Sequence, residues 1–411
     1  MKRKFKISIL LRVGFPIIMI SFFLINCSQE ITPPLNENVN ESAPTPIITS
    51  INPEDGLAGI TEFTITGENF STVLEENVVY FGSTPAMILS ATQTLLEVIP
   101  PNVVQDSIAV YMNTTAALFS DSVIVNLKSA AIEVYSFADF EQPYAITADK
   151  VGNIYLSFVS DNTGQGIKKL TPQGELLDFA PKGGETFYSG LQYGPEGKLY
   201  GARGGARAIF VIEENTAPAT YAVFENGTSM IDLDFDKNHN IWVAGKGGKI
   251  YRVPSNRTGT SDWKSFEFEP GVSAIKIYND HLYLAATTDV STDIYRMQII
   301  SEDSLGVAEI YFQFSTNFDP LIVANTLTFS ADGQLFIGTN DLDPIKFVNQ
   351  DGSFGTWYEG VLSPDIISFT WGMGNELFIT RASYSGGGIE TTQTILTVNM
   401  EKGGAPQYGR E

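Results

Sequence analysis

The sequence predicts an all-β protein that consists of an N-terminal β-sandwich and a six-bladed β-propeller. Residues 46–127 alternate apolar and polar residues in short runs separated by turn residues, which is typical of a sandwich. A polar–aliphatic–aromatic motif then recurs through residues 130–411 at roughly the length of one propeller blade. The chain also holds 37 Gly and 20 Pro, which indicates many turns, and shows no long helical pattern.

Composition limits the classes of function. A hydrophobic content of 43% with 12% aromatic residues indicates a folded chain. The formal net charge is −22, and the first 26 residues contribute only cations to it, so the remaining chain is more acidic still. Such a surface repels phosphate backbones, which argues against nucleic-acid binding.

Residues 1–26 have the pattern of a signal peptide. The cationic start MKRKFK precedes an apolar run over residues 13–25 that is too short and too interrupted by proline to span a bilayer. Leu24-Ile25-Asn26-Cys27 resembles a bacterial lipobox, which implies that the Cys27 sulfur receives a diacylglycerol and anchors the protein to a membrane. An ordinary secretory signal is the alternative. With one cysteine in the chain, an internal disulfide is excluded.

Residues 27–45 are expected to form a lipidated tether. They are rich in Asn, Glu, Pro and Ser, show no periodicity and would reach about 60 Å when extended. Ser28 follows the cysteine where an Asp would resemble an inner-membrane retention signal. The expected location is therefore the outer membrane, on the cell surface or the periplasmic face.

The segment 46–127 carries four motifs in order. They are Ile51-Asn52-Pro53 with Gly56 and Gly59, Ile65-Thr66-Gly67-Glu68-Asn69-Phe70, Val79-Tyr80-Phe81-Gly82, and Leu96-Glu97-Val98-Ile99-Pro100. Together they resemble the immunoglobulin-like IPT/TIG domain. The resemblance implies either a spacer or a direct binding domain, since fold alone does not give function.

The propeller prediction rests on six aromatic anchors, one for each expected blade. Their separations are 45, 42, 41, 53 and 42 residues, and the longest leaves room for an insertion around residues 300–309. The anchors are Tyr155, Tyr200, Trp242, Tyr283, Phe336 and Phe378.

The stretches 149–156 and 236–243 resemble NHL-type six-bladed propellers. A ring of this kind needs a strand that closes it. A ring closes best when one blade combines strands from both ends of the chain, because no open edge then remains. The β-rich run Ile132–Phe137 is available as the outer strand of the sixth blade, and the C-terminal residues 404–411 compete for that place.

The signals for catalysis are few. His239 and His281 align with turn and strand-edge positions of other blades, which argues against a histidine-centred metal site. Six-bladed propellers include calcium-dependent lactonases and lyases, which implies Asp149, Asp236 and Asp332 as candidate acids and calcium as a possible cofactor. All three acids fall in the same turn, however, and we interpret them as turn-forming residues.

Loops on the opposite face of the propeller are more irregular, so binding residues are expected there. Aromatic rings and polar groups in these loops would suit a glycan, and a solvated set of loops is the alternative. Trp242 is expected in the core, while Trp371 is either in the core or lining the channel. The candidate ligand-binding residues are Tyr188, Arg203, Arg207, Asp319, Asp341, Arg381 and Tyr384.

The expected function is therefore that of a noncatalytic cell-envelope lipoprotein. The overall pattern resembles that of surface lipoproteins associated with glycan capture in Gram-negative bacteria, which implies that the propeller contacts a polysaccharide or an outer-membrane transporter. The alternative is a metal-dependent lyase or lactonase acting at the propeller channel, and the sequence leaves the question of catalysis open.

Overall fold

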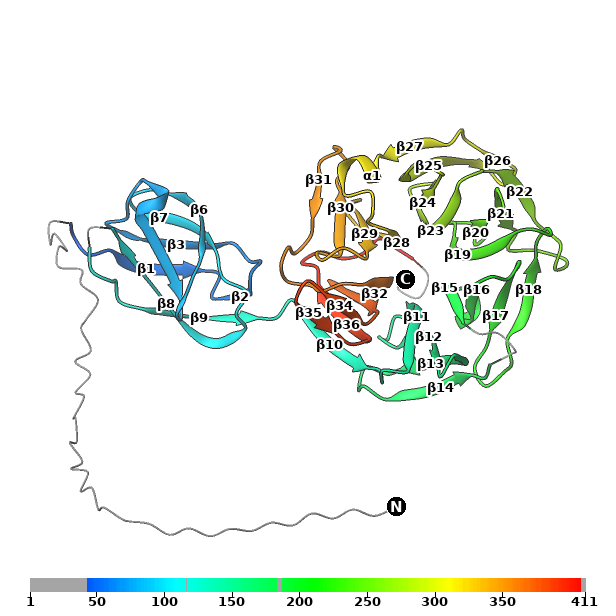
Figure 1. Ribbon diagram of the computed structural model, residues 1–411, viewed down its shortest axis with the longest axis horizontal. Coiled ribbons are helices and arrows are strands. Elements are labelled where there is room, and N and C mark those ends of the chain that lie inside the picture. The colour runs from blue at the N-terminus through cyan, green and yellow to red at the C-terminus, as the bar shows by residue number, and fades with distance from the viewer. Residues whose placement is uncertain (1–42, 116, 183–186, 408–411) are drawn as a thin grey trace, which may run out of the picture.

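The computed structural model describes residues 43–115, 117–182 and 187–407. The predicted signal peptide, Cys27 and most of the predicted tether lie outside the described residues. Within the described ranges, no helix is long and apolar enough to cross a membrane. The secondary structure is almost entirely β-strand, arranged as a sandwich followed by a ring of blades (Figure 1), so the predicted fold class is confirmed.

The sandwich consists of two sheets packed face to face. The first has the strand order β1 (Ile47–Asn52), β3 (Phe63–Glu68), β7 (Leu95–Ile99), β6 (Met87–Ala91). The second has the order β2 (Asp55–Leu57), β9 (Val123–Lys128), β8 (Gln105–Thr114), β4 (Asn77–Phe81), β5 (Thr84–Pro85), and the short 3₁₀ helix η1 (Leu74–Glu76) precedes β4.

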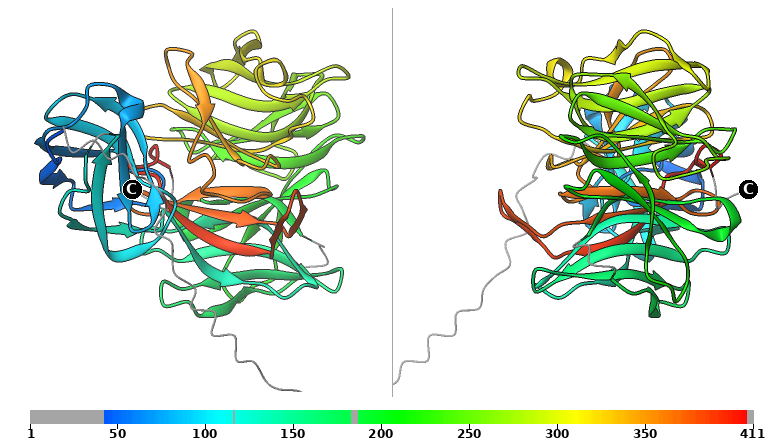
Figure 2. Two further views of the ribbon diagram at one scale, coloured as in Figure 1. Left: turned by 60° about the vertical axis from the view of Figure 1, so that its left-hand side comes forward. Right: turned by 90° about the vertical axis from the view of Figure 1, so that its right-hand side faces the viewer.

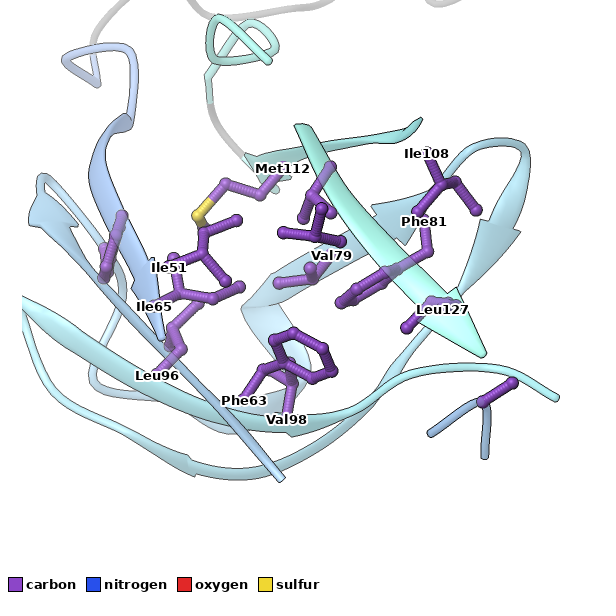
Figure 3. Packing of buried hydrophobic residues seen from close by; sticks show 14 residues of the cluster. Ile51, Phe63, Ile65, Val79, Phe81, Leu96, Val98, Ile108, Met112 and Leu127 are labelled. Atoms are coloured by element: carbon purple, nitrogen blue, oxygen red, sulfur yellow. The ribbon is translucent and has the colours of Figure 1, made fainter. Parts of the chain in front are cut away.

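Alternation along the strands builds the core of the sandwich. Phe63 and Ile65 on β3 face Val79 and Phe81 on β4, and all four side chains are completely buried. Figure 3 shows them converging between the sheets, with the Phe63 and Phe81 rings edge to face at 5.6 Å. The inward direction predicted for these residues from their period of two is therefore confirmed.

The propeller contains six blades, each with its first strand innermost. Blades 1 to 3 are β11 (Glu141–Ala148), β12 (Ile154–Ser160), β13 (Thr163–Leu170), β14 (Leu176–Ala180); β15 (Tyr188–Tyr193), β16 (Leu199–Arg203), β17 (Ala208–Ile212), β18 (Ala219–Val223); and β19 (Ser229–Phe235), β20 (Ile241–Lys246), β21 (Lys249–Val253), β22 (Lys264–Glu267). The 3₁₀ helix η2 (Pro195–Gly197) lies between β15 and β16.

Blades 4 to 6 complete the ring. They are β23 (Gly271–Tyr278), β24 (His281–Thr287), β25 (Thr292–Ser301), β27 (Glu309–Phe312); β28 (Ala324–Phe329), β29 (Leu335–Thr339), β30 (Ile345–Val348), β31 (Phe354–Thr356); and β32 (Ile366–Trp371), β33 (Glu376–Arg381), β36 (Thr394–Asn399), β10 (Ala131–Ser136). The helix α1 (Phe314–Asn317) follows blade 4, and the hairpin of β34 (Tyr384–Gly386) and β35 (Ile389–Thr391) extends from blade 6.

The sixth blade closes the ring with strands from both ends of the propeller sequence. β10 pairs antiparallel with β36, from Ala131 opposite Val398 to Ser136 opposite Thr394. The prediction that the run beginning at Ile132 supplies the outer strand is confirmed. The C-terminal segment takes another path, since Ala405 N donates to Phe329 O and Ala331 N donates to Gly403 O. This segment therefore runs to the centre of the ring (Figure 1).

The six aromatic anchors all lie on the second strand of their blade, and none exposes more than 7% of its surface. The longer spacing before the fifth anchor is also explained. β25 continues into a short hairpin with β26 (Ser304–Leu305), in which Ser301 pairs with Ser304. The predicted insertion is thus an extension of blade 4.

Polar side chains join neighbouring blades at the innermost strands. Most inner strands contain a bulge, and the residue at the bulge reaches the next blade. Ser189 Oγ donates to Ile231 O at 2.7 Å, Ser273 Oγ donates to Ala324 O at 2.7 Å, and Asn325 Nδ2 donates to Ile366 O at 2.8 Å. These bonds hold the wall of the central channel together.

The sandwich lies beside blades 5 and 6 of the ring, as the turned views of Figure 2 also show. Asn102 Nδ2 donates to Gly360 O at 3.2 Å, and Gly59 lies against Asn102 and Val361. These contacts fall outside the channel.

Candidate ligand site at the mouth of the propeller channel

The turns between first and second strands are built around a carboxylate in two blades. Asp236 Oδ1 accepts the backbone N–H of Asn238 and Asn240, while its Oδ2 accepts the indole N–H of Trp242 at 2.8 Å. Asp149 does the same in blade 1, where the hydroxyl of Tyr155 donates to its Oδ2 at 3.0 Å. The turn-forming interpretation of these two acids is confirmed.

Asp332 lies in the corresponding turn of blade 5, as predicted, but its side chain does not take the position that Asp149 and Asp236 occupy. Ser330 lies six residues before its anchor, as Asp149 and Asp236 do, and its Oγ accepts the backbone N–H of Gln334 at 3.1 Å. Asp332 instead accepts from Ser330 Oγ and pairs with Lys402 Nζ at 2.9 Å.

The two histidines lie at a turn and at the start of a strand, as predicted. His239 adopts a φ of +67°, and His281 begins β24 with its Nδ1 2.8 Å from Asn279 O.

Both tryptophans considered from the sequence lie in the core. Trp242 and Trp371 are completely buried. Trp371 packs with Phe336 at a centroid distance of 6.2 Å, so it belongs to the contact between blades 5 and 6 and does not line the channel.

Tyr188 must be corrected as a candidate for ligand binding. It begins β15, is completely buried and packs its ring against Gly201 and Phe210. A ring enclosed in this way cannot stack on a sugar. The strand begins earlier than the sequence suggested, so the side chain points into the blade.

The other predicted residues are distributed over separate loops and have protein partners. Arg207 Nη1 donates to Phe224 O at 2.6 Å, and Arg381 Nη2 donates to Thr392 O at 3.3 Å. Asp341 pairs with Lys346 at 2.6 Å. Arg203 lies over the Phe210 ring at 5.4 Å, Asp319 Oδ1 accepts from Leu321 N, and Tyr384 begins the β34 hairpin. Their role in binding stays a prediction.

A cavity of about 420 Å³ opens on the other face, where the first strands of blades 2 to 5 end. This volume is within the range of small-molecule sites. Its walls include four aromatic rings: Tyr278 stacks on Phe329 with centroids 4.5 Å apart and planes at 10°, and Tyr193 and Phe235 also line the cavity. Residues 405–407 of the C-terminal segment complete the wall.

The floor of this cavity is charged. Asp234 on β19 accepts the backbone N–H of Ile277 at 2.8 Å, and its Oδ2 lies 3.6 Å from Lys276 Nζ on β23. One step deeper, Asp232 accepts the N–H of Ile275 at 3.0 Å and borders a polar channel of about 20 Å³, which is room for a water molecule. Both side chains thus cross the seam between blades 3 and 4.

Enclosure by the ring alters the proton affinity of these acids. Burial raises the pKa of Asp232 to about 6, although Lys276 and two backbone N–H groups act against the rise. Burial also raises the pKa of Asp234, again opposed by Lys276. The cause is desolvation, which disfavours the charged form of a carboxyl group.

Sequence reasoning missed Asp232, Asp234 and Lys276 because it looked for function in turns and loops. A signal was present: Asp232 and Asp234 are two positions apart within the run MIDLDF, so both project to the same face of a strand. Acids at that spacing in an innermost strand face the channel or the neighbouring blade. Lys276 interrupts the apolar run AIKIY in the same way.

The channel acids do not fit the calcium site that the resemblance to propeller enzymes suggested. Calcium requires six to eight oxygen ligands, whereas Asp232 and Asp234 both accept backbone N–H groups and share the ammonium of Lys276. In the ranges that the structure covers, no three side chains among His, Cys, Asp and Glu are grouped to hold a metal ion.

Comparison with known proteins identifies the first domain and the fold of the second. Residues 46–131 match the IPT/TIG domain family, so this segment is an IPT/TIG domain. Curated protein sequences give no match.

Among solved structures, a protein of unknown function from Bacteroides thetaiotaomicron is similar over 87% of this chain and 98% of its own, with a TM-score of 0.50 and 11% identity. A gluconolactonase from Xanthomonas campestris is similar over 66% of this chain and 88% of its own, with a TM-score of 0.51 and 14% identity. An auxiliary nutrient binding protein from Bacteroides thetaiotaomicron has a TM-score of 0.49, with 10% identity over 87% of this chain and 98% of its own. The TM-scores of 0.50 and 0.51 indicate that the first two proteins share the fold, and at identities this low the similarity leaves function open.

Proposed function

We propose that the protein is a noncatalytic binding protein of the cell envelope that holds a saccharide at the mouth of the propeller channel. The observation that carries this proposal is the cavity of about 420 Å³, which combines aromatic walls with a charged floor. Saccharides have apolar ring faces and polar rims, and they match walls and a floor of these two kinds. Four blades contribute to the cavity, so it is held by a rigid scaffold.

The roles of the side chains follow from their positions. The stacked pair of Tyr278 and Phe329 offers an aromatic surface, of which Tyr278 is the partly buried member and Phe329 the buried one. Gln192, Asp234 and Lys276 supply donors and acceptors below it. Turn residues Asp236 and Asn240 fix the ends of the strands, so that the rim needs little rearrangement to bind a ligand.

The envelope location rests on the N-terminal sequence. Diacylglycerol on Cys27 would anchor the protein in the outer membrane, with residues 28–45 as a tether. An outer-membrane transporter is then a natural partner to receive the captured ligand. The Cys27→Ser variant is expected to appear in the soluble fraction of cells, while the wild-type protein remains with membranes after a high-salt wash. Equal partition of both proteins would contradict lipid anchoring.

The binding site is tested by titrating an oligosaccharide panel against the wild-type protein and two tyrosine variants. Tyr278→Ala should weaken binding at least tenfold, because aromatic stacking is lost. Tyr384→Ala is the matched control, since it removes a tyrosine from the irregular loops of the other face. A loss confined to Tyr384→Ala would move the site to those loops. Absence of binding throughout the panel, or turnover of a lactone substrate, would overturn the proposal.

A further inference from the structure

The floor of the cavity and the deeper channel below it together carry more negative than positive charge. Among the described residues there, Asp234 in the floor and Asp232 in the deeper channel contribute two carboxylates, and Lys276, which lines both, contributes one ammonium. Lys276 is only 12% exposed and the Asp234 side chain only 9%. Buried charges are costly unless they are paired, so a second cation would be favourable here.

Lys276 interacts with both acids and forms no short ion pair with Asp234. Its Nζ lies 3.6 Å from Asp234 Oδ2, which is longer than the 2.7–2.9 Å typical of a charged hydrogen bond. Asp232 also interacts electrostatically with Lys276. Since Lys276 lines both the cavity and the deeper channel, its flexible stem allows it to turn toward Asp232 when another cation approaches Asp234.

The walls favour the same kind of ligand. An aromatic face within about 6 Å attracts a cation, and the Tyr278–Phe329 pair stands on β23 and β28 directly beside the charged floor. The rim does not oppose this preference, because Lys237 is neutralised by Asp280 at 2.7 Å. The formal net charge of −22 further attracts cations from solution.

We infer that the saccharide carries an ammonium group, which binds between Asp234 and the Tyr278 ring while Lys276 pairs with Asp232. This inference rests on the proposed function and names its ligand class: an amino sugar with a free amine. An N-acetylated sugar lacks the charge, and a uronic acid would meet Asp234 as a like charge.

The test is a calorimetric titration with three matched oligosaccharides: a glucosamine oligomer, its N-acetylated counterpart and a uronic-acid oligomer. The glucosamine oligomer is expected to bind at least tenfold more tightly than the other two, and its affinity should fall as salt is added. Asp234→Asn should weaken its binding about tenfold, with little effect on the N-acetylated oligomer.

Lys276→Met is the most informative variant, because whether it strengthens or weakens binding depends on the charge of the ligand. Removing the competing ammonium should strengthen binding of the glucosamine oligomer several-fold, whereas an anionic ligand would bind more weakly. Lys264→Met removes an ammonium on the outer strand β22, away from the cavity, and serves as the matched control, with little change expected. Circular dichroism of each variant checks that the fold is kept.

The outcomes separate this inference from the proposed function. Preferential binding of the N-acetylated or uronic oligomer, still lost in Tyr278→Ala, would overturn the ammonium inference and leave the saccharide site in place. Weaker binding of the glucosamine oligomer to Lys276→Met would also overturn the inference. Failure of all three oligomers to bind would overturn both.

Discussion

At the scale of single residues, the Asp236–Trp242 pair links a turn to the core of its blade. The carboxylate fixes the turn by accepting two backbone N–H groups and then reaches the indole of the anchor. Because both side chains are buried, the hydrogen bond is shielded from water and charge-assisted. One aspartate thereby couples the end of a strand to the packing between blades.

Trp242→Phe is therefore expected to lower the free energy of unfolding by about 2–3 kcal/mol, since a buried charged acceptor loses its donor. The measurement is urea denaturation followed by circular dichroism. Tyr200→Phe in blade 2 is the matched control, because Gly194 stands where the aspartate would be. A change within about 0.5 kcal/mol is expected there. A loss in Trp242→Phe no larger than that in Tyr200→Phe would show that the hydrogen bond to the carboxylate adds nothing to stability.

Asp232 makes stability depend on pH. Its folded pKa of about 6 lies above the ordinary value of 3.8, so the folded state binds the proton more tightly than the unfolded state. Its contribution is therefore fully present below about pH 4 and is lost as the pH rises through 6. Two pKa units correspond to about 3 kcal/mol.

Asp232→Asn should remove this contribution. We expect the fall in unfolding free energy between about pH 4 and pH 7 to be smaller in the variant by about 3 kcal/mol. Urea midpoints at the two pH values provide the measurement, and the difference between them cancels any constant effect of the amide. Asp319→Asn, in an exposed loop, is the control. An unchanged pH dependence would mean that Asp232 is solvated in the channel.

At the scale of elements, β10 is the strand on which closure of the ring depends. It covers the edge of β36, and Thr394 Oγ1 donates to Tyr135 O at 2.7 Å. Val134 and Tyr135 pack against the core between blades 6 and 1. An unpaired β36 would present open backbone groups to other chains.

A chain that begins at Phe137 and lacks β10 is thus expected to lose about 3–5 kcal/mol of stability. The loss comes from the packing of two half-buried side chains and from the backbone hydrogen bonds between β10 and β36. It should also associate, which size-exclusion chromatography would detect. A chain that begins at Ser129 lacks the IPT/TIG domain but keeps β10, and it should remain monomeric. Monomeric, cooperative folding of both chains would contradict the closure role of β10.

Elements with a strong period were predictable from the sequence, while side-chain directions at element ends were not. The anchors and β10 were found because spacing and alternation are properties of whole strands. Tyr188 was assigned to a loop because the sequence does not show where β15 begins, and as the first residue of that strand its ring is buried in the blade. Asp232 and Lys276 come together only through the seam between blades, and sequence periodicity does not reveal which strands of different blades face each other.

At the scale of the whole molecule, the cavity belongs to the propeller, and the IPT/TIG domain contacts the propeller away from it. The IPT/TIG domain contacts blades 5 and 6 through an exposed hydrogen bond, Asn102 to Gly360, and through packing of Gly59 near Val361. The cavity lies at the centre of the ring and draws on blades 2 to 5. None of the described side chains of the sandwich lines the cavity, so we expect the sandwich to act as a spacer.

The spacer role predicts that removing residues 1–128 leaves the cavity intact. The chain beginning at Ser129 should bind the preferred oligosaccharide within twofold of the full chain's affinity, because the interdomain contacts of Asn102 and Gly59 lie outside the channel. Its propeller should lose no more than about 1 kcal/mol of stability, the usual contribution of one exposed hydrogen bond. Calorimetry and urea denaturation on the two chains provide both values. A loss of affinity beyond tenfold would mean that the sandwich contacts the ligand, and a direct binding role for the IPT/TIG domain would replace the spacer.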